Sequence, residues 1–120
     1  MNREQLRAHC LSKTAAVEEF PFGEGVAVFK VMGKMFALLP VAGDLQISLK
    51  CEPVFAVILR ENYPAVTPGY HLNKRHWNSV RVDGSVADDE IEEWVDHSYE
   101  QVVKGLTKAQ KQRLDQQGSR

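Results

Sequence analysis

The sequence has few cysteines, no long apolar run and no excess of either charge. Cys10 and Cys51 stand far apart and form no CxxC pair. This is typical of a reduced intracellular protein and excludes a disulfide scaffold. The apolar runs 35–41 and 54–59 are far shorter than the roughly 20 residues of a membrane helix. No apolar signal core follows the first residues. We therefore expect a soluble cytoplasmic protein, which we take to be a monomer, away from membranes.

The balance of charge limits the partners that the chain can bind. There are 15 Lys and Arg against 16 Asp and Glu, which gives a net charge of −1. Strongly basic binders of the histone kind are excluded, because their affinity needs many cations that neutralise phosphates. A local basic patch is still possible. Nucleic acid bound through such a patch would have only modest affinity for the chain. The 120 residues suffice for one domain. We place it at 1–107, followed by a polar, basic and frayed tail at 108–120.

The common catalytic signatures are also missing. The chain contains no GxSxG, HExxH, Walker or GxGxxG motif. Gly23 and Gly25 lie before a predicted strand, which indicates a turn rather than a phosphate loop. Cys10 and Cys51 could each be a nucleophile, but small buried residues are the commoner interpretation. We therefore expect no enzyme, no catalytic residue and no cofactor.

Hydrophobic periodicity predicts an α+β fold. Alternation and β-branched residues indicate strands, with a tight hairpin at Gly33. Pro53 suits the first position of a helix. Asp88 is a natural N-cap for the last helix, and Gly105 suits a left-handed C-cap. The prediction is an antiparallel sheet packed against helices. Its order is a helix at 2–16, strands at 26–31, 34–41 and 45–50, a helix at 53–62, a short strand at 70–72, a strand at 76–83 and a helix from 88 to about 104.

A basic and aromatic stretch runs from residue 70 to 81. It carries three fixed positive charges and no acid. Strand alternation puts Asn78 on one face and Trp77 and Arg81 on the other. Cations beside an aromatic ring and amides would serve phosphate contact and base stacking. In the alternative interpretation, Trp77 packs under a loop and the charges merely solvate a turn.

An acidic stretch follows directly. Residues 83–100 hold eight acidic side chains and no Lys or Arg. This pattern is typical of a solvated helix face with acids at the positive end of the helix dipole. Two other hypotheses stay open, a docking face for a basic protein partner and a weak iron site at 88–96. The four histidines have no zinc-site spacing.

Several blocks of sequence resemble the MmcQ/YjbR family over roughly residues 5–107. They are Phe-Pro-Phe-Gly-Glu-Gly at 20–25, Val-Phe-Lys-Val at 28–31 with Gly-Lys-Met-Phe-Ala at 33–37, Ser-Leu-Lys-Cys at 48–51, Pro-Gly-Tyr-His-Leu-Asn-Lys-Arg-His-Trp-Asn at 68–78 and Asp-His-Ser-Tyr at 96–99. The resemblance implies a fold similar to the double-wing C-terminal domain of the phage transcription factor MotA, and loosely to CyaY. It also implies DNA binding without established catalytic residues. The natural positions for nucleic acid are Lys30, Lys34, Lys50, Asn73, Lys74, Arg75, His76, Trp77, Asn78 and Arg81.

Overall fold

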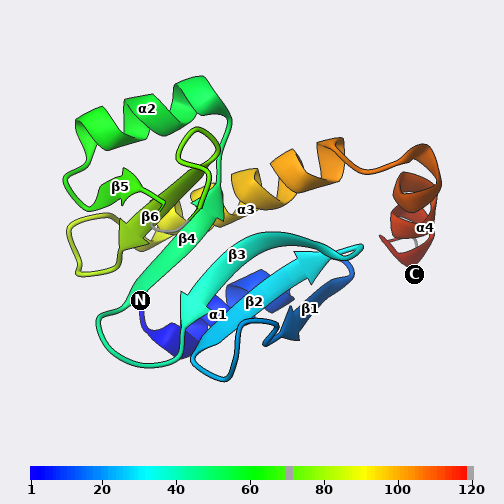
Figure 1. Ribbon diagram of the computed structural model, residues 1–120, viewed down its shortest axis with the longest axis horizontal. Coiled ribbons are helices and arrows are strands. Elements are labelled where there is room, and N and C mark those ends of the chain that lie inside the picture. Colours follow the sequence, from blue (N-terminus) through cyan, green and yellow to red (C-terminus); the bar gives the residue numbers. More distant parts are fainter. Residues whose placement is uncertain (70–71, 119–120) are drawn as a thin grey trace.

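Helices pack against one antiparallel sheet, as the computed structural model shows for residues 1–69 and 72–118. The α+β prediction is confirmed. The sheet has six strands in the order β1-β2-β3-β4-β6-β5 (Figure 1). In chain order the elements are α1 (Arg3–Leu11), β1 (Ala16–Glu19), β2 (Val26–Val31), β3 (Lys34–Pro40), β4 (Gln46–Lys50), α2 (Pro53–Asn62), β5 (Val66–Pro68), β6 (Trp77–Arg81), α3 (Asp88–Lys104) and α4 (Lys108–Gly118).

The first helix is shorter than its predicted range of 2–16. Asn2 caps it, since its side chain accepts from the Gln5 amide while the Gln5 side chain accepts from the Asn2 amide. The helix ends at Leu11, and Ala15 takes a φ of 62°. This left-handed residue turns the chain into β1, a strand that the sequence prediction missed.

The β2–β3 hairpin forms where Gly33 predicts it. Gly33 has a φ of 81° and Met32 a φ of 49°. Positive φ at both central residues defines the hairpin turn whose twist matches that of the flanking strands. Lys34 therefore lies directly opposite Val31, at the tip of the hairpin.

The core lies between the sheet and the helices on one of its faces. Register puts Ala37, Leu49 and Asn78 opposite one another on this face. Figure 1 shows α1 and α3 behind the sheet and α2 beside β5 and β6. Strands β3 and β4 pair at only two positions, so β1–β2–β3 and β4–β6–β5 diverge into two groups.

Strands near the basic stretch differ from their predicted ranges. Strand β5 lies at Val66–Pro68, before the short strand expected at 70–72, and Leu72 lies in a bend. The first two residues of the expected strand, 70 and 71, lie outside the described residues. Strand β6 spans Trp77–Arg81, within the predicted range of 76–83.

Both predicted caps of α3 are wrong. Its N-cap is Ala87, which makes no side-chain bond, and Asp88 begins the helix instead. Gly105 has a φ of −85°, because its amide still donates to the Val102 carbonyl in a helical geometry. The helix therefore does not stop in a left-handed turn.

The segment expected to be a frayed tail contains α4. Of its residues only Leu114 is buried, and Gly118 lies against Thr14. A polar helix with one apolar anchor gives too weak a periodicity to be predicted from sequence. Residues 119 and 120 lie outside the described part of the chain.

Candidate nucleic-acid interface

One end of the β4–β6 pair gathers seven of the ten predicted site residues. Register sets Lys50 opposite Trp77 and Leu49 opposite Asn78. The Cys51 amide donates to the His76 carbonyl at 2.7 Å, which ties the loop before β6 to the end of β4. The seven residues at this end are Lys50, Asn73, Lys74, Arg75, His76, Trp77 and Asn78.

Trp77 is buried, contrary to the prediction that it points outward. Only 8% of its surface is exposed. Strand alternation places it on the same face as Arg81, and Gly69 of the segment after β5 lies against it. A Cβ added at Gly69 would lie 2.8 Å from the Trp77 Cβ, so only glycine lets the loop approach this closely. The structure therefore agrees with the alternative interpretation, in which Trp77 is packed rather than exposed.

Asn78 is also buried, on the opposite face of the sheet. Its Oδ1 accepts a hydrogen bond from Arg60 Nε at 2.6 Å, and its Nδ2 donates to the Ala56 carbonyl at 3.3 Å. Its amide thus joins β6 to α2. Both polar ends of the Asn78 amide therefore already have partners inside the protein, although Asn78 is one of the predicted positions for nucleic acid.

Arg60 belongs to this end of the sheet although no sequence pattern indicated it. Besides Asn78, it donates from Nη2 to the Trp77 carbonyl at 3.2 Å and to the Lys74 carbonyl. A guanidinium has several donors in a fixed plane, so one residue holds three acceptors. The only hint in the sequence was that this basic residue directly follows Leu59, which is buried, and precedes Glu61, which is exposed.

The loop before β6 presents its cations from a fixed backbone. Asn73 Oδ1 accepts from the Arg75 amide at 2.9 Å, which is an Asx turn. Lys74 Nζ donates to the Gly69 carbonyl at 3.1 Å. Lys74 and Arg75 are exposed, whereas His76 is half-buried. Arg75 has no ion pair within the described residues.

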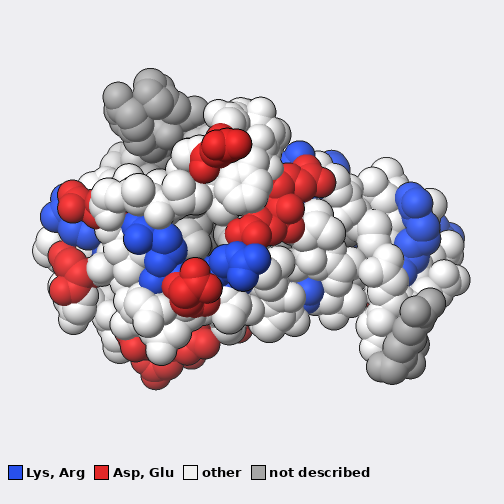
Figure 2. Space-filling model, turned by 90° about the horizontal axis from the view of Figure 1, so that it is seen from below, with Lys and Arg blue, Asp and Glu red and all other residues white. Residues whose placement is uncertain are grey.

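The remaining predicted cations lie elsewhere. Lys30 Nζ forms an ion pair with Glu19 at 2.9 Å on neighbouring strands. Lys34 is at the tip of the β2–β3 hairpin, and Arg81 is opposite Gln46 at the far end of β6. Basic and acidic side chains are interspersed on the face seen in Figure 2. The ten residues therefore do not form one continuous patch.

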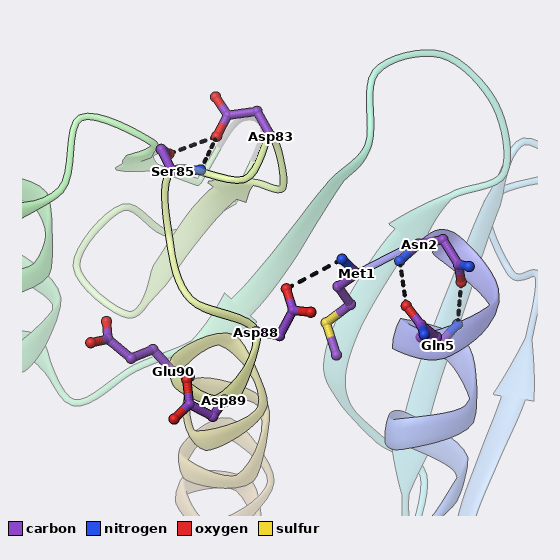
Figure 3. A network of polar contacts seen from close by, with 8 residues as sticks. All are labelled: Met1, Asn2, Gln5, Asp83, Ser85, Asp88, Asp89 and Glu90. Carbon is purple, nitrogen blue, oxygen red and sulfur yellow. Dashed lines mark hydrogen bonds and ion pairs between the residues drawn. The ribbon is translucent and has the colours of Figure 1, made fainter.

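Several carboxylates of the acidic helix α3 bind partners within the same chain. Asp88 binds the Met1 amino group at 3.2 Å, near the Asp83–Ser85 turn (Figure 3). Glu90 accepts from the Tyr63 hydroxyl at 2.6 Å. These contacts join α3 to the chain's start and to the end of α2.

Two more carboxylates of α3 contact His9 of α1 and Lys13, which follows α1. His9 contacts Glu92 at 3.0 Å and Asp96 at 2.8 Å, and Lys13 also binds Asp96. Burial acts to raise the pKa of Asp96, but hydrogen bonds from Lys13 and His9 outweigh burial and leave that pKa below its ordinary value. These acids therefore bind α1 to α3. Among described residues no three His, Cys, Asp or Glu form a group that could hold a metal ion.

Both cysteines are buried, as the sequence analysis expects. Burial raises the pKa of the Cys10 thiol to about 12 and that of Cys51 to about 11. A thiol with such a pKa holds almost no thiolate at neutral pH, and thiolate is the nucleophilic form. Both side chains belong to the hydrophobic core.

The comparison with known families confirms the resemblance. The sequence profile of the YjbR family matches residues 11–101. The chain belongs to the YjbR family. It is 34% identical over 117 residues to the uncharacterised YjbR of Escherichia coli K12, covering 97% of this chain and 99% of that protein. It is 35% identical over 96 residues to uncharacterised YbdF of Escherichia coli O157:H7, covering 79% of each.

Solved structures share the fold. The crystal structure of the Deinococcus radiodurans protein DR2400, with the domain DUF419, matches this YjbR-family chain with a TM-score of 0.87 at 39% identity. The match covers 93% of this chain and 86% of that one. A Pseudomonas syringae protein matches with a TM-score of 0.73 at 28% identity, over 84% of this chain and 98% of the other. The likeness to MotA and CyaY stays a prediction. No helix in the described residues is long and apolar enough to cross a bilayer.

Proposed function

We propose that this YjbR-family domain binds nucleic acid, most directly DNA, through phosphate contacts made by Lys50, Lys74 and Arg75. The observation that supports this proposal is the basic loop before β6. Its backbone is held by the Asx turn at Asn73 and by Arg60, while the side chains of Lys74 and Arg75 are exposed. Fixed exposed cations suit phosphate oxygens.

The same burial that fixes the loop limits what it reads. Trp77 and Asn78 lie inside the protein, so neither stacks on a base nor bonds to a base edge. Contacts to phosphate alone carry no sequence information. The proposed binding is therefore weak, sensitive to salt and indifferent to sequence, which agrees with a net charge of −1.

The proposal also covers catalysis, oligomeric state and location in the cell. As part of this proposal the domain is non-enzymatic and acts as a monomer. The proposal includes a cytoplasmic location, which agrees with the free thiols of Cys10 and Cys51, because such thiols are kept reduced there.

Fluorescence anisotropy with a labelled DNA duplex tests the proposal. Lys74→Ala and Arg75→Ala should each weaken binding, by about three- to tenfold for the loss of one phosphate contact. Lys34→Ala is the matched control, because Lys34 is an exposed lysine at the tip of a different hairpin. Equal loss in the control and the loop variants would contradict the assignment of the loop.

A further inference from the structure

The outer face of α2 is apolar and exposed. Val54 is 65% exposed, and Val57 and Ile58 are each 46% exposed. Their spacing of three and four residues puts them on one stripe of the helix. Ala56 and Leu59, on the inner face, are buried in the core. A surface helix ordinarily carries polar side chains on its outer face, so this stripe is unpartnered.

An open groove of about 410 Å³ runs between this stripe and the basic loop. Pro53, Val54, Val57 and Ile58 form its apolar wall, and Arg60 and Arg75 form its cationic wall. Its size is in the range of pockets that take organic side chains. No acidic residue of the described chain lines it, although Glu61 lies further along α2.

The two arginines differ in whether their guanidinium donors already have partners. Arg60 is half-buried, and its Nε and Nη2 atoms are used by carbonyl and amide oxygens of β6 and the loop. Arg75 is exposed and makes no ion pair in the part of the chain that the structure describes. A carboxylate brought into the groove would meet Arg75 in a bidentate contact beside an apolar wall.

We infer that this groove binds an acidic amphipathic segment of a partner protein. Apolar side chains of that segment lie on Val54, Val57 and Ile58, and a flanking carboxylate pairs with Arg75. This is the mode by which helices dock in grooves. Aliphatic side chains give a nucleobase no aromatic ring to stack on, which disfavours a nucleic acid here. Three apolar residues are also too small a surface for a stable dimer.

Amide shifts of the ¹⁵N-labelled protein test the inference with a defined probe. The probe is a capped helical peptide of about twelve residues, with leucines at i, i+3, i+4 and i+7 and glutamates beside them. We expect shifts at Val54, Val57, Ile58 and Arg75, and binding at least about tenfold tighter than for the same peptide with lysines. Equal binding of the two peptides, or shifts that avoid α2, would overturn the inference.

Charge reversal at one residue gives the sharpest control. Arg75→Glu should invert the preference, so that the lysine peptide binds more tightly than the glutamate peptide. Lys111→Glu, an exposed site on α4, should leave the preference unchanged. Val57→Asp should remove binding of both peptides while circular dichroism shows an intact fold. This failure is distinct from that of the proposed function, because Val57→Asp leaves Lys50, Lys74 and Arg75 in place for DNA.

Discussion

Trp77 and Asn78 are neighbours in β6, yet they are buried on opposite faces of the sheet. The alternation of the strand was predictable from sequence, and it holds. The cover on each side was not predictable, because it comes from distant residues. Gly69 lies against Trp77, and Arg60 on α2 bonds the Asn78 side chain. At the scale of the residue, a polar or aromatic side chain shows its role only once its neighbours are known.

Replacing Asn78 separates a structural role from base reading. Asn78→Ala leaves Arg60 Nε and the Ala56 carbonyl without their partner. Loss of one partner of a buried hydrogen bond costs about 1–3 kcal/mol, so urea unfolding should show a drop of that size. DNA affinity measured on the folded variant should stay near that of the parent. An unchanged unfolding midpoint together with lost DNA affinity would restore the reading role.

At the scale of the element, α2 is fixed to α3 at its first turn. The Glu52 side chain caps α2 by accepting from the Val54 and Phe55 amides. The Glu52 amide donates to His97 Nε2 at 3.2 Å, and the Phe55 and His97 rings meet edge to face at 5.0 Å. Pro53 at the start of α2 was predictable from sequence, whereas His97 as its partner was not, since 45 residues separate Glu52 from His97.

The contact between Glu52 and His97 predicts that the stability of the fold depends on pH. Burial lowers the pKa of His97 below its ordinary 6.5, and its Nε2 must stay unprotonated to accept from Glu52. The unfolded chain therefore binds the proton more readily than the folded one. The stabilisation is complete above about pH 6.5 and is lost as the pH falls below it. Urea midpoints from about pH 7.5 to 5 should fall less in His97→Gln than in the parent. Parallel curves for the two proteins would contradict this account.

Helix α4 shows where local prediction stops. Its sequence is polar, and its place depends on Leu114 and on Gly118 against Thr14. Leu114→Ala should therefore release α4 alone. Hydrogen exchange should then show lost protection in residues 109–117 and unchanged protection in β2 and β3. Loss of protection in the sheet as well would show that α4 is part of the cooperative core.

At the scale of the whole molecule, the sequence predicts the order of most elements but not which charged side chains pair with one another. The hairpin at Gly33 and the start of α2 at Pro53 follow from local rules. The pairing of acids on α3 with His9, Lys13 and the Met1 amino group depends on tertiary packing. That pairing reduces the acidic face open to a partner. The loop before β6 keeps Lys74 and Arg75 exposed.

The salt dependence of DNA binding tests the proposed function most directly. Three phosphate contacts predict a slope of about −2.7 for the logarithm of the association constant against the logarithm of salt concentration. The affinity should then fall about 40-fold between about 50 and 200 mM salt, for duplexes of unrelated sequence alike. Removal of Lys74 should reduce the slope by about one. A slope near zero, or no binding at the lower salt concentration, would contradict the account.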